Sequence, residues 1–157
     1  MRKSIMGSSL GHNLLPSAGG WLDLEKLATV ELSSEDALYP FENALHGGEG
    51  DGWKAGSPGP QVIRLNFDRP QPLSRIHVKF CEDKVERSQE FAIFASSPAQ
   101  DRREVARQQW TFSPGGSTVE TEDYRVNLPA VSTLELHIDP GRHNRQIFAT
   151  LRSIAVA

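Results

Sequence analysis

Residues 61–80 alternate apolar and polar side chains in two short runs, with a proline-containing turn between them. The apolar positions are Ile63, Leu65 and Phe67 in the first run, and Ile76, Val78 and Phe80 in the second. Alternation with a period of two is typical of a strand with one face buried and the other in water. Because the turn at 68–72 is short, the two runs predict an antiparallel pair of strands.

The same pattern recurs along most of the chain. Alternating runs occupy 28–33, 61–67, 73–80, 88–95, 104–112, 119–128, 131–138 and 147–156. Segments rich in Gly, Pro, Ser and Asp separate these runs, and only 40–46 and 103–110 compete as short helices. Eight short strands with so little helix predict an all-β protein, an eight-stranded antiparallel β-sandwich of the jelly-roll kind.

The length and the N-terminal composition suggest one domain preceded by an arm. With 157 residues the chain can bury a core of its own. Residues 1–20 are rich in Gly and Ser without periodicity, so we expect a flexible arm there and a single domain over 21–157. An equally good alternative is that Leu10, Leu14 and Leu15 pack on the domain. The arm lacks an apolar run of signal-peptide length, and we therefore expect a cytoplasmic protein.

Net charge and cysteine content narrow the classes of partner. A formal net charge of −3 gives no global field that would gather nucleic acid or an anionic membrane, so we expect neither as a partner. No stretch is apolar enough over the length of a transmembrane helix. The single cysteine, Cys81, excludes an internal disulfide and a cysteine-based zinc cluster. We expect no cofactor.

The long segment 34–60 interrupts the series of strands. It holds several Gly and Pro residues, yet Tyr39, Phe41, Leu45 and Trp53 are spaced along it. Loops of this length in compact domains are usually functional or disordered. Because aromatic side chains gain from burial, we expect this segment to fold back on the sandwich as a packed cover.

No catalytic motif stands out. The glycine-rich run at 47–52 is not followed by a helix that could hold a phosphate, and Cys81 and His77 lack a recognisable oxyanion hole. His77 and His137 lie at outward strand positions beside Arg75, Lys79 and Glu135. A solvated face with cross-strand charge pairs explains them better than a ligand platform does. We therefore expect a protein that is not an enzyme.

The ordered succession of segments resembles a known family. The segments are SSED, PFENALHG, GWKA, GPQVIRLNFDRPQPLSRIHVKF and RSQEFAIFASS, with STLELHIDP and ATLRSIAV at the end. In this order, over roughly 27–156, the sequence resembles the discoidin or coagulation factor 5/8 type C family. It is also similar to the N-terminal domain of the single-strand-break repair scaffold protein. The resemblance implies an eight-stranded jelly roll, also called galactose-binding-domain-like.

The resemblance departs from the members of the family that bind structural calcium. Those members carry an Asp-Gly-Asn turn, a Thr shortly before the tryptophan and an acidic residue in the last strand. The corresponding residues here are His46-Gly47-Gly48, Gly52 and Ser153, which offer few of the oxygen ligands that calcium needs. Glu49 and Asp51 could compensate, but we expect no metal.

In this family the loops at one end of the sandwich bind ligands. By resemblance these loops are 34–60, 81–87, 113–118 and 139–146 in this chain. Their candidate ligand-binding residues are Glu35, Asp36, Tyr39, Glu82, Asp83, Arg87, Arg142, His143 and Arg145. Charged donors and acceptors beside an aromatic ring suit sugar hydroxyls, and they suit a protein surface equally well. We expect a non-enzymatic binding module for a carbohydrate or similar polar ligand. The alternative is a protein-interaction or assembly module, homo-oligomers included.

Overall fold

The computed structural model describes residues 1–6, 20–45 and 50–157. Predictions that concern Leu10, Leu14, Leu15 and 46–49 lie outside the described residues. The strands are β1 (Arg2–Ile5), β2 (Ala28–Leu32), β3 (Trp53–Pro58), β4 (Gln61–Cys81), β5 (Arg87–Ser96), β6 (Arg103–Phe112), β7 (Val119–Asp139), β8 (Phe148–Leu151) and β9 (Ser153–Val156). The helical segments are α1 (Leu24–Leu27) and the 3-10 turn η1 (Phe41–Ala44). No helix in the described ranges is long and apolar enough to cross a membrane.

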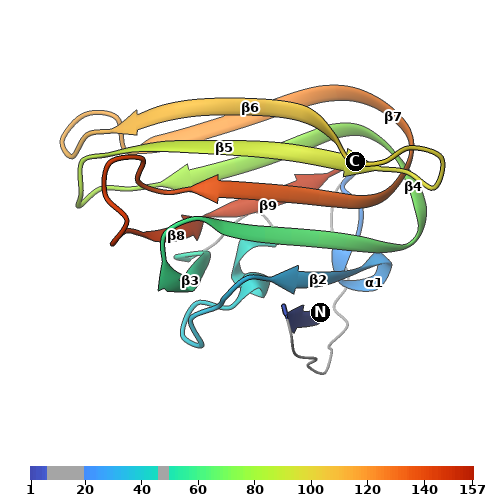
Figure 1. Ribbon diagram of the computed structural model, residues 1–157, viewed down its shortest axis with the longest axis horizontal. Coiled ribbons are helices and arrows are strands. Elements are labelled where there is room, and N and C mark those ends of the chain that lie inside the picture. The colour runs from blue at the N-terminus through green and yellow to red at the C-terminus, as the bar shows by residue number, and fades with distance from the viewer. Residues whose placement is uncertain (7–19, 46–49) are drawn as a thin grey trace.

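Two long strands, β4 and β7, run through both layers of a β-sandwich. They pair with each other along their length, and the register is irregular between Asn66 and Arg75, where both strands bend at one end of the molecule (Figure 1). In the first layer the order is β1, β2, the first half of β4, the second half of β7, β5 and β6. In the second layer β9 lies beside the second half of β4, which pairs with the first half of β7. The all-β sandwich predicted from the alternation is confirmed.

The predicted pairing of 61–67 with 73–80 is wrong. Both runs belong to β4, and each pairs with β7 instead: Ile63 lies opposite Leu136, and Ile76 lies opposite Tyr124. The physical reason is that both runs carry an apolar face, and two such faces form a core when they lie opposite each other in two layers. Alternation therefore specifies which side of a strand is buried, but it does not specify the strand's partner.

Two further strands lie where none was expected. Arg2–Ile5 forms β1, which pairs in parallel with β2, so the start of the predicted flexible arm is part of a sheet. Trp53–Pro58, inside the predicted long loop, forms β3 and pairs with β8. The rest of that segment does act as a cover, because Phe41, Leu45 and Trp53 are buried. One turn of 3-10 helix lies within the predicted helical stretch 40–46, whereas 103–110 is strand.

The predicted gathering of loops at one end is present. Backbone hydrogen bonds join the β4–β5 and β6–β7 loops (Glu82 N to Thr118 O, 2.8 Å), and join the β7–β8 loop to β5 (Arg142 N to Ser88 O, 3.1 Å). Gly59 N donates to Ile147 O at 2.9 Å, which brings the turn before β4 to the same end. In Figure 1 these loops lie at the left, opposite the bends of β4 and β7. We call this end of the sandwich the loop end.

Candidate functional site

A shallow hollow of about 240 Å³ lies on the outer face of the first layer. Its floor contains Ala92 of β5, which lies between Arg107 of β6 and His137 of β7 in the register of the sheet. Ala92 is 2% exposed and is absent from the apolar core, although its neighbours Phe91 and Ile93 belong to it. A methyl group between two long side chains leaves space on the sheet surface, and this is why the hollow forms here.

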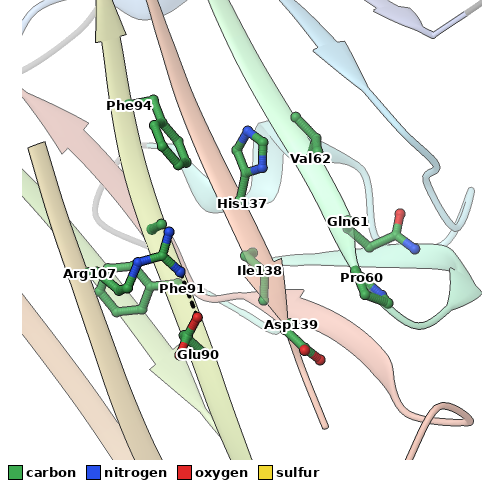
Figure 2. A pocket seen from close by; sticks show the side chains of 11 residues that line it. Pro60, Gln61, Val62, Glu90, Phe91, Phe94, Arg107, His137, Ile138 and Asp139 are labelled. Carbon is green, nitrogen blue, oxygen red and sulfur yellow. Dashed lines mark hydrogen bonds and ion pairs between the residues drawn. The ribbon is translucent and has the colours of Figure 1, made fainter. Parts of the chain in front are cut away.

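The side chains around this space come from four adjacent strands (Figure 2). We call it the sheet-face hollow and define it by Val62, Glu90, Ala92, Phe94, Arg107, His137 and Asp139. Phe94 and His137 meet edge to face, with ring centroids 4.7 Å apart. The guanidinium of Arg102 lies over the ring of Phe94, 4.5 Å from the ring centroid. One wall of the hollow is therefore aromatic and cannot collapse onto Ala92.

Glu135 lies on the same face of β7 as His137 and holds the side chains of the wall in place. Its Oε1 lies 2.8 Å from His137 Nε2 and 3.1 Å from Arg102, and its Oε2 accepts from Arg64 Nε at 2.9 Å. Burial acts to raise the pKa of this carboxyl, but the hydrogen bonds from its three partners outweigh burial and hold the pKa at about 2. Glu135 therefore stays charged and fixes the orientation of the His137 ring.

Glu90 and Asp139 form the border of the hollow towards the loop end. Glu90 accepts hydrogen bonds from Gln109 (3.0 Å) and Arg107 (2.6 Å), and chiefly the bond from Gln109 lowers its pKa below the ordinary value. Both oxygens of Asp139 accept from Arg145 at 3.0 Å. The guanidinium of Arg142 lies 4.0 Å from Glu90. Arg142 and Arg145, two of the residues predicted from the β7–β8 loop, therefore lie at the edge of the hollow.

Other predicted residues have structural roles. The Arg87 guanidinium is buried and donates to Glu82 (2.9 Å), to Gln89 (2.9 Å) and to the Pro140 carbonyl (2.8 Å). It also lies 4.8 Å from the centroid of the Phe112 ring. Arg87 and Glu82 therefore tie the β4–β5 loop to the β7–β8 loop, and they are not available to a ligand.

The residues predicted before β3 lie away from the hollow. Glu35 accepts from the Phe41 backbone N–H at 2.7 Å and pairs with Lys3, and Asp36 caps the Leu38 N–H at 2.9 Å. Tyr39 stands with Phe148 on either side of Lys54, whose Nζ is 5.6 Å and 5.4 Å from the two ring centroids. We call Tyr39, Lys54 and Phe148 the aromatic corner.

The predicted set therefore does not form one site. Arg142 and Arg145 border the sheet-face hollow, Tyr39 belongs to the aromatic corner, and Asp83 and His143 are exposed on their loops. Ala92, Phe94 and Arg107 were not predicted as site residues, and His137, which was expected on a solvated face of charge pairs, lines the hollow. The signal that could have found them is an alanine at an outward position between long polar residues, and it becomes visible only when the neighbours of β5 are known.

The outer face of the second layer carries the basic residues Arg75, His77 and Lys79 of β4. Arg75 forms two hydrogen bonds with Asp123, at 2.8 and 2.5 Å, and its guanidinium lies 4.6 Å from the centroid of the Trp21 ring. His77 Nδ1 is 3.7 Å from the same Asp123. These contacts agree with the expected cross-strand charge pairs.

The charged side chains around the hollow already have partners. Within the described ranges no group of three His, Cys, Asp or Glu side chains could hold a metal ion. The carboxyls that flank the hollow are engaged by cations or amides, and the guanidinium groups of Arg107, Arg142 and Arg145 lie in or beside it on partly exposed side chains. Such an arrangement can hold a polar ligand against an aromatic wall.

Comparison with known proteins gives a fold but no sequence family. No family model matches the chain, and no curated protein matches it. Among solved structures, the family 32 carbohydrate-binding module of C. perfringens NanJ in complex with galactose is 16% identical, with a TM-score of 0.59, and the match covers 82% of this chain and 92% of that one. The corresponding module of AlyQ with 4,5-unsaturated mannuronic acid is 18% identical (TM-score 0.56; 84% and 95% covered).

A protein-binding domain has the same fold. Reduced XRCC1 bound to the catalytic domain of DNA pol beta is 11% identical, with a TM-score of 0.56 and coverage of 80% of this chain and 91% of that one. The chain therefore has the galactose-binding-domain-like β-sandwich fold of family 32 carbohydrate-binding modules and of XRCC1, as the sequence resemblance implied.

Proposed function

We propose that this protein is a non-enzymatic binding module that takes a carbohydrate in the sheet-face hollow. The observation that carries the proposal is the combination of a space over Ala92, an aromatic wall made by Phe94 and His137, and an adjoining row of guanidinium donors. Sugars offer apolar ring faces for the aromatic wall and hydroxyl oxygens for the donors. The modules with this fold that hold galactose and a mannuronic acid support the same class of ligand.

The test fills the hollow without changing charge. Ala92→Leu places an isobutyl group above the floor, and we expect it to weaken saccharide binding about tenfold or more, which is about 1.4 kcal/mol. Binding is measured by isothermal titration with galactose oligosaccharides and mannuronate oligosaccharides as probes. The matched control is Ala155→Leu, the same change at an outward position on β9 in the other layer.

Circular dichroism of both variants shows whether the fold persists. Equal saccharide binding by wild type and both variants would show that the saccharide does not bind in the sheet-face hollow. A wild-type protein that binds none of the probes at millimolar concentration would refute the carbohydrate function.

A different observation favours a second candidate function, protein interaction. Four large apolar side chains are exposed in the described part of the chain: Leu38, Val85, Val119 and Phe148. Val85, Val119 and Phe148 lie in or directly beside loops of the loop end, and exposed apolar groups are found on interaction surfaces. The XRCC1 complex with DNA pol beta shows that one protein of this fold binds another protein. Binding of a protein at the loop end would be insensitive to Ala92→Leu, which separates the two candidates.

A further inference from the structure

We infer that the saccharide bound in the sheet-face hollow carries a carboxylate, and that Arg142 and Arg145 of the β7–β8 loop bind it; this inference rests on the proposed function. It follows from the state of the charged groups around the hollow. Hydrogen-bond acceptors there are already engaged, whereas donors are exposed and incompletely used.

The carboxylate oxygens around the hollow already accept hydrogen bonds from protein side chains. Each of the two oxygens of Glu90, Asp139 and Glu135 already has a hydrogen bond from an arginine, a glutamine or a histidine. Their side chains are only 24%, 28% and 10% exposed. A ligand hydroxyl that enters the hollow would have to share these oxygens with cations that bind them more strongly.

The guanidinium groups of the β7–β8 loop, in contrast, are exposed and have N–H donors that are not used. The side chains of Arg142 and Arg145 are 43% and 60% exposed, whereas all three guanidinium nitrogens of Arg107 are engaged by Glu104 and Glu90. Across the described residues, the guanidinium of Arg142 has no hydrogen bond and only the 4.0 Å ion pair with Glu90. A guanidinium has five N–H donors, and Arg145 uses one of its nitrogens for both of its bonds to Asp139. Planar forks of this kind match a carboxylate with two parallel hydrogen bonds.

The β7–β8 loop holds these two arginines in place. Gly141 is buried, and a Cβ at this position would lie 2.6 Å from the Asn144 carbonyl oxygen, so the turn is tight. Asn144 N donates to Gly141 O at 3.2 Å, and the Asn144 side chain accepts from Gln146 N at 2.9 Å. Arg142 N is anchored to Ser88 on β5. A loop held this firmly places the backbone of Arg142 and Arg145 beside the hollow, so that little backbone entropy is left to lose on binding.

The experiment compares sugars that differ only by the carboxylate. Digalacturonate is titrated against the galactose disaccharide of the same linkage, and dimannuronate against the corresponding mannose disaccharide. We expect wild-type protein to bind at least one acidic disaccharide about tenfold or more tightly than its neutral partner at low salt, and the preference to shrink as salt is added. In Arg142→Gln/Arg145→Gln the acidic and the neutral sugar should bind about equally. Arg125→Gln, an exposed arginine in the other layer, should keep the preference.

The outcomes separate this inference from the proposed function. If neutral and acidic sugars bind equally and Ala92→Leu abolishes both, the carbohydrate site stands and the inference of an acidic ligand is overturned. An acidic preference that survives in Arg142→Gln/Arg145→Gln overturns the assignment of these two arginines. If no sugar of either pair binds, the proposed function and the inference fail together.

Discussion

At the residue scale, the most unusual group is Glu120, a carboxyl buried between the layers. It is 1% exposed, its Oε1 is 3.5 Å from Gln89 Nε2, and its Oε2 has no hydrogen-bond partner among the residues that the structure describes. Burial, assisted by the nearby charge of Glu122, raises the pKa of Glu120 from the ordinary 4.5 to about 7. The folded protein therefore binds a proton there that the unfolded chain releases at lower pH.

This shift predicts how stability changes with pH. Between pH 4.5 and about 7 the folded state holds more protons than the unfolded state, so the contribution of Glu120 to stability is lost as the pH rises through that interval. The loss amounts to about 3 kcal/mol. Glu120→Gln should remove this dependence, so that urea unfolding at pH 4.5 and pH 8 gives a smaller difference than in wild type. Glu86→Gln, on an exposed loop, is the control. An unchanged pH dependence in Glu120→Gln would show that another group is responsible.

At the scale of elements, the small β3–β8 sheet depends on a single glycine. Gly52 precedes β3 with φ of +73°, and a Cβ there would lie 2.2 Å from the Leu151 carbonyl oxygen of β8. Only glycine combines this backbone conformation with so close an approach. The aromatic corner and the buried Trp53 are positioned by this pair of strands.

Gly52→Ala should therefore lower the free energy of unfolding by more than the strain of the backbone conformation alone. We expect a loss of about 2–4 kcal/mol of unfolding free energy, because strained backbone and a clash with backbone add together. Gly115→Ala is the matched control, since its φ is +81° but nothing lies within 4 Å of the added Cβ. That variant should lose about 1 kcal/mol. Equal losses in the two variants, measured by chemical denaturation, would contradict the role given to the close approach.

At the scale of the whole molecule, two strands supply both layers of the sandwich. The halves of β4 and of β7 are covalently continuous across the bend, and their apolar faces meet in one core. The outer faces of the two layers carry different side-chain arrangements. On the face of the second layer Arg75 contacts Asp123 and Trp21, and on the face of the first layer a hollow lies over Ala92.

The stability of the whole domain also tests the expectation that no calcium is bound. Gly52 and Ser153 stand where calcium-binding relatives of the resembled family have ligands, so we expect the melting temperature to be the same in excess calcium and in EDTA. A ligand that binds only the native state must raise the melting temperature by mass action. A rise of several degrees with calcium would show that Glu49, Asp51 or backbone carbonyls form a site.

Local pattern alone predicted much of this protein. The alternation around Ile63 and Ile76 correctly identified the buried faces of β4, and the aromatic residues of 34–60 indicated a packed cover, because burial and period two depend on the chain's own backbone geometry. The partners of each strand could not be predicted in this way, since pairing joins residues far apart in the sequence. The two halves of β4 were therefore paired with each other instead of with β7.

The candidate site shows the same division. The sequence by itself determined which sides of the strands are buried, and its resemblance to a known family implied that charged loops, one of which contains Arg142 and Arg145, meet at one end of the sandwich. Only the tertiary structure decided that Arg87 is used to tie loops together, and that the space for a ligand lies on the sheet over Ala92. The reason is physical: a hollow is defined by the side chains of neighbouring strands, and Arg107 and His137 become neighbours of Ala92 only when the sheet has formed.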